Sequence, residues 1–303
     1  MGSIAFVFSG QGAQYSGMGK DLYDNVPVAA EIFKRLDGIR PGTSIQCFEG
    51  SKEELSQTEN TQPCMFALEL AAAAALEAAG IKCSMTAGFS LGEISALTYS
   101  KAISLDDGFR LVCLRGKFMQ DASEGVDGGM AAVIKLEAST VEELCSRYEH
   151  VYPVNYNCPG QISVSGLKSE LADFSIDVKN AGGRAVPIRV NGVFHSPFME
   201  DAAKKLGEAL EGFEISTPKI TLYSDYTADI YDNDYKTLLS KQICSPVRWQ
   251  SIIENMIEKG IDTFIEIGPG KTLCGLISKI NSEVRTFNVE DSESLNKTVR
   301  EVL

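Results

Sequence analysis

The pentapeptide G-F-S-L-G at 88–92 constrains the fold more than any other part of this 303-residue chain. A run of small residues precedes it, and a helix-like segment over 93–101 follows it. The G-x-S-x-G spacing is typical of a nucleophile elbow, in which a strand turns sharply into a helix and exposes a serine hydroxyl near helix N–H groups. It therefore predicts Ser90 as a nucleophile, although the pentapeptide alone also fits an ordinary turn serine.

The chain has only two histidines that could serve as the imidazole base for Ser90. His195 follows an expected strand and precedes an expected helix, so its ring can point into a cleft. His150 follows an expected surface helix, which is typical of a structural histidine. By elimination, the sequence predicts His195 as the general base of a serine-dependent acyl transfer.

Short apolar runs alternate with helix-like segments over most of the chain, which favours a mainly parallel sheet covered by helices. The order changes near residue 128, where strand, helix, two strands around a turn at 157–160, helix and strand follow one another. This β-α-β-β-α-β order predicts a ferredoxin-like insert over 128–195. The large α/β domain is then expected over 1–127 and 196–303. Its expected elements are strands at 4–8, 219–223 and 263–267 and helices at 26–36, 62–79, 106–122, 197–210 and 246–259.

Composition excludes several functional classes. The net charge of −13 argues against a general nucleic-acid or anionic-membrane surface, because either would need a basic field. The longest apolar run, 66–79, is alanine-rich, carries two glutamates and is too short for a membrane span. The first residues show no secretory signal pattern, so a cytoplasmic protein is expected. Two distant histidines and eight scattered cysteines have no metal-ligand spacing, so no metal site is expected.

Arg115 lies within an apolar stretch of the expected helix 106–122. A charge in such a stretch needs a partner. Guanidinium forms a planar, bidentate pair with carboxylate, so a substrate carboxylate would serve. The arginine therefore indicates an acyl donor with a free carboxylate, such as the half-thioester of a diacid.

Six motifs occur in the order typical of one enzyme family. They are F-S-G-Q-G-A-Q at 8–14, G-F-S-L-G-E at 88–93, R-G at 115–116, N-Y-N-C-P-G-Q at 155–161, V-F-H-S-P at 193–197 and E-I-G-P-G at 266–270. From about residue 4 to 280 the chain resembles a malonyl-CoA:acyl carrier protein transacylase. The resemblance implies an α/β-hydrolase-like large domain and a ferredoxin-like small domain, with the site in the cleft between them.

The resemblance also implies a role for each site residue. Ser90 would carry the malonyl group as an ester, while His195 would accept its proton and later activate the pantetheine thiol of the carrier protein. Backbone N–H groups of Gln11 and Leu91 would form the oxyanion hole, and Arg115 would bind the malonyl carboxylate. The other implied residues are Phe194 and Asn157 for substrate binding and Gln242, whose main-chain carbonyl would orient the histidine.

Two positions bear on the acyl pocket. The family usually has histidine where this chain has Phe89, a position that we expect to pack or to give a secondary hydrogen bond. Leu91 and Phe194 are similar to the residues that accompany malonyl rather than methylmalonyl use in related polyketide acyltransferases. A ring at 194 would occupy the space of an α-methyl group.

The implied partners are malonyl-CoA and an acyl carrier protein, with no cofactor besides the coenzyme A thioester and with a monomeric enzyme. Because such carrier proteins are acidic, an enzyme of charge −13 needs a local basic rim. The candidates for this rim are Lys117, Lys168, Arg184, Arg189 and Lys271.

Three alternatives to a transacylase of fatty-acid synthesis share some of these features. A discrete acyltransferase that serves a polyketide synthase has the same motifs and stays open. A serine esterase or thioesterase shares the elbow, but it would need an acid between the serine and the histidine and usually an H-G-G oxyanion loop. A non-catalytic docking module is difficult to reconcile with the presence of Ser90, His195 and Arg115 together.

Overall fold

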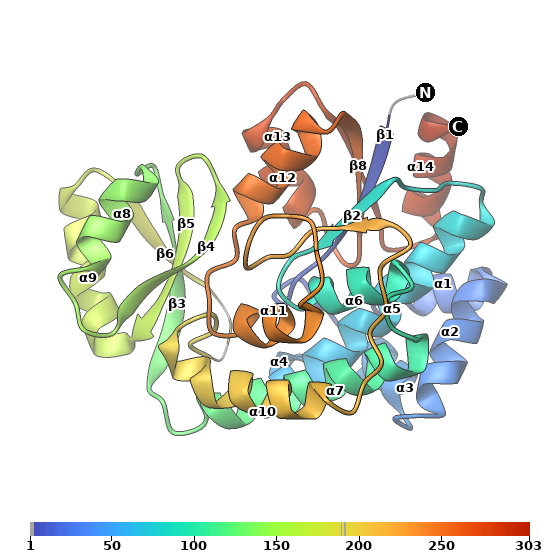
Figure 1. Cartoon of the computed structure of the whole chain (residues 1–303), viewed down its shortest axis with the longest axis horizontal. Helices are drawn as coiled ribbons and strands as arrows, with labels where there is room; N and C mark the ends of the chain where they lie inside the picture. The colour runs from blue at the N-terminus through green and yellow to red at the C-terminus, as the bar shows by residue number, and fades with distance from the viewer. Residues whose placement is uncertain (1–2, 189, 191) are drawn as a thin grey trace.

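The computed structural model describes residues 3–188, 190 and 192–303. It contains two separate sheets, a five-stranded parallel sheet with the order β7-β2-β1-β8-β9 and a four-stranded antiparallel sheet with the order β4-β5-β3-β6. Figure 1 shows the small sheet with α8 and α9 at the left, and the large sheet with the remaining helices at the right. The predicted mixture of a mainly parallel sheet and a second module is confirmed.

The large sheet is built around β1 (Ser3–Phe8), whose last four residues are fully buried. An uninterrupted apolar strand of this kind is typical of a parallel sheet covered on both faces. β1 pairs with β2 (Met85–Gly88) and β8 (Ile261–Ile267), and the edges are β7 (Thr221–Leu222) and β9 (Arg285–Val289). Phe8 lies opposite Gly88, so the loops after β1 and β2 meet at one edge of the sheet.

Helices cover both faces of this sheet. Their bounds are α1 (Lys20–Asn25), α2 (Pro27–Asp37), α3 (Thr43–Glu49), α4 (Lys52–Ser56), α5 (Thr58–Ala78), α6 (Gly92–Tyr99), α7 (Leu105–Ser123), α10 (Glu200–Leu210), α11 (Tyr235–Gln242), α12 (Trp249–Glu258), α13 (Thr272–Ile280) and α14 (Ser292–Val302). A short 3₁₀ turn, Pro197–Met199, precedes α10 where one continuous helix was expected.

The start of α5 differs from the sequence-based expectation. The helix was expected from residue 62 because Thr61 and Pro63 resemble a helix entry, but it begins at Thr58 and contains Pro63. The missing proline N–H leaves one intrahelical bond unmade. Thr58 and Thr61 in the first turns are fully buried, and the Thr61 hydroxyl donates to the Leu55 carbonyl oxygen at 2.5 Å. Tertiary packing therefore extends the helix on the N-terminal side of its proline.

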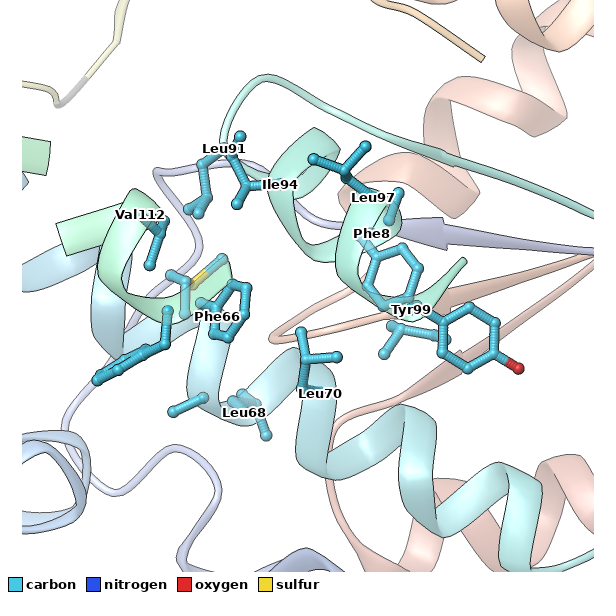
Figure 2. Packing of buried hydrophobic residues seen from close by; sticks show 14 of the residues in the cluster. Phe8, Phe66, Leu68, Leu70, Leu91, Ile94, Leu97, Tyr99 and Val112 are labelled. Carbon is cyan, nitrogen blue, oxygen red and sulfur yellow. The ribbon is translucent and has the colours of Figure 1, made fainter. Parts of the chain in front are cut away.

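A dense apolar cluster lies behind the elbow. Figure 2 shows side chains from β1, α5, α6 and α7 converging there, with Phe66 of α5 between Phe8, Ile94 and Val112. The rings of Phe8 and Tyr99 have centroids 5.7 Å apart in a tilted arrangement. Because such cores pack at crystal-like density, the elbow is attached to a rigid base.

The small sheet comprises β3 (Gly128–Ile134), β4 (Val151–Cys158), β5 (Gln161–Leu167) and β6 (Arg184–Ile188), with α8 (Ala138–Cys145) and α9 (Lys168–Asn180) packed against it. The chain order β-α-β-β-α-β is the one predicted for a ferredoxin-like insert. The last strand expected in the insert is β6, which ends at Ile188, and residue 189 lies outside the described residues. Val247, just before α12, hydrogen bonds to β4 through both Val154 and Tyr156, which joins the two modules.

Candidate active site

Ser90 lies in a sharp turn between β2 and α6. Its φ is 55°, in the left-handed region that non-glycine residues rarely adopt. The flanking glycines permit this turn, because a Cβ at Gly88 would lie 1.9 Å from the carbonyl of Gly92, and one at Gly92 would lie 2.3 Å from the Phe8 oxygen. The local geometry is the nucleophile elbow that the sequence predicts.

His195 faces the serine. Its Nε2 lies 2.7 Å from Oγ of Ser90, and its Nδ1 lies 2.9 Å from the main-chain oxygen of Gln242. A carbonyl accepts from Nδ1–H, which leaves Nε2 free to accept the serine proton. Burial, and next the positive charge of Arg115, lower the pKa of His195 from 6.5 to about 4. The imidazole is therefore neutral at physiological pH, the state that a general base needs.

His150 has a different environment. Its Nδ1 lies 2.8 Å from Oε1 of Glu170, and its ring lies 5.8 Å from that of Phe198. Its side chain is about one-third exposed, at 34%. These contacts fit the structural role that the sequence indicated.

Arg115 projects from α7 to the same serine. Its guanidinium donates to Oγ of Ser90 at 3.2 Å, to Oε1 of Gln242 at 2.9 Å and to Oε1 of Gln62 at 2.9 Å. The side chain is only 1% exposed, and within the described residues it forms no salt bridge. Burial lowers its pKa to about 10, so it keeps its charge at neutral pH. A buried cation that has only neutral hydrogen-bond partners suits an incoming carboxylate.

The helix that carries Arg115 packs unusually close to α5. A Cβ on Gly116 would lie 3.0 Å from the Thr58 carbonyl oxygen and 3.2 Å from Cα of Glu59. The glycine therefore allows α7 to approach near enough for the Arg115 guanidinium to contact Gln62 of α5.

Of the two predicted oxyanion donors, Leu91 lies in the elbow and Gln11 in the loop after β1. The loop after β1 touches it directly, since a Cβ on Gly10 would lie 2.9 Å from the Phe89 oxygen. In the part of the chain that the structure describes, the backbone N–H groups of Gln11 and Leu91 have no hydrogen-bond partner. N–H groups without a partner in the elbow and in the loop that contacts it can stabilise a developing oxyanion.

A cavity of about 290 Å³ opens over Ser90 and His195 between the two modules. The predicted residues Gln11, Phe194 and Asn157 all line it. Arg115 is not among the lining residues, but its guanidinium donates to two of them, Ser90 and Gln62. Asn157 donates to the Ser163 hydroxyl at 3.0 Å. Apolar lining comes from both modules, through Phe89, Met119, Met130, Ile188 and Leu273.

Comparison with known proteins covers nearly the full chain. Residues 5–299 match the acyl transferase domain family. The malonyl CoA-acyl carrier protein transacylase of Bacillus subtilis strain 168 is 39% identical over an alignment 313 residues long, gaps included. The alignment covers 99% of this chain and 97% of that protein. The chain belongs to the malonyl CoA-acyl carrier protein transacylase family.

Solved transacylase structures have the same fold. The malonyl CoA-acyl carrier protein transacylase from Clostridium perfringens superposes with a TM-score of 0.95 at 41% identity, covering 99% of this chain and 97% of its own. A malonyl-transacylase solved in complex with a type II polyketide synthase acyl-carrier protein also gives 0.95, at 33% identity with 99% of each chain covered. The resemblance inferred from the six motifs is confirmed.

Sequence reasoning missed several polar residues at this transacylase site. Gln62 binds the Arg115 guanidinium, and the Gln242 side chain, in addition to its main-chain oxygen, joins Arg115 to the Ser90 carbonyl at 2.7 Å. Asp225 accepts from the Ser90 N–H at 2.6 Å. No motif marks these residues, because their partners are brought together only by tertiary packing.

The structure bears on two further predictions, the packing of Phe89 and the basic rim. Phe89 packs edge-on against Trp249, with ring centroids 5.5 Å apart, which is the packing alternative for this position. Two candidates for the basic rim already pair with acids: Lys117 with Asp121 at 3.1 Å and Lys168 with Asp127 at 2.6 Å. Arg189 lies outside the described residues.

The searches for metal and membrane features cover the described residues. Within them, no group of three or more His, Cys, Asp or Glu side chains could hold a metal ion. No helix in the described part of the chain has the length and apolarity needed to cross a membrane.

Proposed function

We propose that this protein transfers a malonyl group from malonyl-CoA to the phosphopantetheine thiol of an acyl carrier protein, through a malonyl ester on Ser90. One observation carries the proposal: Oγ of Ser90 contacts Nε2 of His195 at 2.7 Å and the Arg115 guanidinium at 3.2 Å. The nucleophile therefore has a base on one side and a carboxylate-binding cation on the other. The printed names of relatives that cover the full chain support the same activity.

In the first half-reaction, the Ser90 hydroxyl gives its proton to Nε2 of His195 as Oγ attacks the thioester carbonyl. The carbonyl oxygen becomes negative and accepts hydrogen bonds from the N–H groups of Gln11 and Leu91. The C–S bond then breaks, and the coenzyme A thiolate takes the proton from His195. The product is a malonyl ester on Ser90.

The second half-reaction reverses these roles. The carrier-protein thiol gives its proton to His195 and attacks the ester carbonyl, and the Ser90 oxygen recovers that proton when the C–O bond breaks. The positive charge of Arg115 is the second cause, next to burial, of the low pKa of His195. A malonyl carboxylate bound at Arg115 offsets that charge and so raises the pKa of His195. Binding of a malonyl donor therefore makes the base stronger when it is needed.

The proposal includes the setting of the reaction. We place the enzyme in the cytoplasm as a monomer that needs no cofactor besides the coenzyme A thioester, and in fatty-acid synthesis. A second candidate role is the supply of malonyl groups to a polyketide carrier protein. One observation favours that role, namely the malonyl-transacylase in complex with a type II polyketide synthase acyl-carrier protein that superposes at a TM-score of 0.95.

The test follows malonyl-CoA with and without an acyl carrier protein. We expect malonyl transfer to the carrier to exceed hydrolysis, and we expect a malonyl mass on the peptide that contains Ser90 when the carrier is omitted. Ser90→Ala is the matched control and should acquire no label. Hydrolysis that is unaffected by carrier protein would indicate an esterase instead, and a label on a cysteine would overturn the role of Ser90.

A further inference from the structure

A buried carboxyl lies directly behind the nucleophile. Asp225 follows β7, the strand that pairs with β2, and is fully buried. Its Oδ2 accepts from the Ser90 N–H at 2.6 Å and from Nε2 of Gln242 at 3.1 Å. One oxygen atom therefore contacts both the backbone of the nucleophile and the residue whose carbonyl oxygen lies 2.9 Å from Nδ1 of His195.

Asp225 is itself held in place from α6. Oε1 of Glu93 accepts from the Asp225 N–H at 3.0 Å and from the Tyr231 hydroxyl at 2.6 Å. Glu93 is fully buried and lies three residues after the serine. The elbow, the segment after β7 and the end of α11 are thereby joined into one hydrogen-bonded unit.

The Ser90 N–H needs such an acceptor. A serine with φ of 55° is strained, and strained backbones persist only where the surroundings hold them. Within the described residues the Ser90 N–H donates to Asp225, and a buried N–H without a partner is costly. Replacing this acceptor therefore removes a restraint on the turn that aims Oγ.

We propose that Asp225 is a positioning residue, which fixes the distance between Ser90 and His195 by binding the Ser90 N–H and the Gln242 amide with one oxygen. This inference rests on the transacylase function proposed above. What the site requires from Asp225 is an acceptor oxygen in that place. A negative charge is not required.

The electrostatic environment of Asp225 supports the statement that a negative charge is not required there. Burial, and next the neighbouring Glu93 carboxyl, raise the pKa of Asp225, while its two N–H donors and Arg115 act in the opposite direction. Each of the two carboxyls also has one buried oxygen, Oδ1 or Oε2, with no partner among the described residues. A neutral amide at position 225 can supply the same acceptor oxygen without the cost of burying a negative charge next to the Glu93 carboxyl.

The experiment compares Asp225→Asn, which keeps an acceptor oxygen, with Asp225→Ala, which does not. Asp229→Asn on the same loop is the control, because that side chain is exposed and contacts no site residue. Malonyl transfer is measured as kcat and KM, together with Tm. Because small misplacements of reacting groups have large effects, we expect Asp225→Ala to lose about 100-fold in kcat with KM within about 3-fold, and Asp225→Asn to stay within about 5-fold of wild type.

Two further readouts separate positioning from a structural role. The labelling rate of Ser90 by phenylmethylsulfonyl fluoride needs no malonyl-CoA and should fall in Asp225→Ala but not in Asp225→Asn. The pH profile of transfer should be the same in Asp225→Asn and wild type, since Asp225 carries no proton in the reaction. If Asp225→Ala does not fold, Asp225→Ser replaces it, because a serine hydroxyl is too short to reach the Ser90 N–H.

The outcomes are distinct. Wild-type kcat in folded Asp225→Ala overturns the inference. An equal loss in Asp225→Ala and Asp225→Asn also overturns it, because that result would indicate that the charge is required. If the wild-type protein transfers no malonyl group, the proposed function fails. The sulfonyl fluoride labelling still decides the role of Asp225 in that case.

Discussion

Ser90 and His195 meet at 2.7 Å with both backbones in the left-handed region, at φ of 55° and 59°. Each such backbone costs on the order of 1–3 kcal/mol in a non-glycine residue. The surroundings hold both residues, the serine through Asp225 and the histidine through the Gln242 carbonyl. The short Oγ to Nε2 distance is therefore built into the free enzyme.

His195→Ala should reduce malonyl transfer by about 10²–10⁴-fold, the usual effect of losing a general base. His150→Ala is the matched control and should change transfer little, because His150 pairs with Glu170 on the small module. Steady-state rates of both variants give the answer. Comparable losses in both would contradict the assignment of His195 as the base.

The pH dependence of transfer should reflect the low pKa of His195. The base is active when neutral, so kcat/KM should rise with pH around a midpoint near 4, below the ordinary 6.5, and stay flat from pH 6 to 8. Arg115→Ala should move the midpoint upward, because the guanidinium charge contributes to the shift after burial. A wild-type midpoint between 6 and 7 would show that the imidazole is not held in this environment.

Arg115→Ala should raise the activation free energy of malonyl transfer, as measured by kcat/KM, by roughly 2–5 kcal/mol. The reason is that the substrate carboxylate loses its charged partner. Acetyl-CoA has no carboxylate to lose, so its transfer should hold or rise. Arg115→Lys should recover only part of the loss, since an ammonium cannot form two parallel hydrogen bonds.

The ratio of the two kcat/KM values is decisive for Arg115. Arg110→Ala is the control, because Arg110 lies on the same helix, is about half exposed, at 52%, and pairs with Asp107. An equal drop for both substrates in a folded Arg115→Ala protein would mean that the arginine supports the structure or binds coenzyme A.

Phe194→Ser should increase the use of methylmalonyl-CoA relative to malonyl-CoA. The ring lines the cavity and packs on Gly192, where a Cβ would lie 2.4 Å from it. The gain should be modest, since one methyl group is worth roughly 1–3 kcal/mol of discrimination. Competition between the two thioesters measures the ratio, and Phe198→Ser, a ring beside His150, is the control. An unchanged ratio would exclude Phe194 from the acyl pocket.

Glu93→Gln should make stability less dependent on pH. Burial raises the pKa of Glu93 from 4.5 to about 7, so the folded protein favours the protonated carboxyl. Its contribution is fully present below pH 4.5 and is lost as pH rises through 7. The free energy of unfolding of Glu93→Gln, from urea titrations, should therefore increase relative to wild type by a few kcal/mol between pH 4.5 and 8. A difference that does not change with pH would contradict the raised pKa.

Local signals in the sequence identified the residues that meet at the serine. The two glycines of the elbow and the scarcity of histidine led to Ser90 and His195, and the charge in an apolar helix led to Arg115. Gln62 and Asp225 could not be found in this way, because each is an ordinary polar residue until α5 or the segment after β7 folds against the elbow. The predicted start of α5 was wrong for a related reason. Burial of Thr58 and Thr61 extends the helix beyond the start that Thr61 and Pro63 indicated.

The close contact of α7 with α5 at Gly116 determines how far the Arg115 guanidinium reaches toward Ser90. Because a side chain there would press α7 away from the Thr58 carbonyl, any larger residue would also withdraw the neighbouring guanidinium from Ser90. Mutant libraries that aim at the transfer of other acyl groups should therefore vary the residues that line the cavity and leave position 116 unchanged. A substitution at 115 would change the group that faces the acyl donor, whereas a substitution at 116 would displace the helix that carries residue 115.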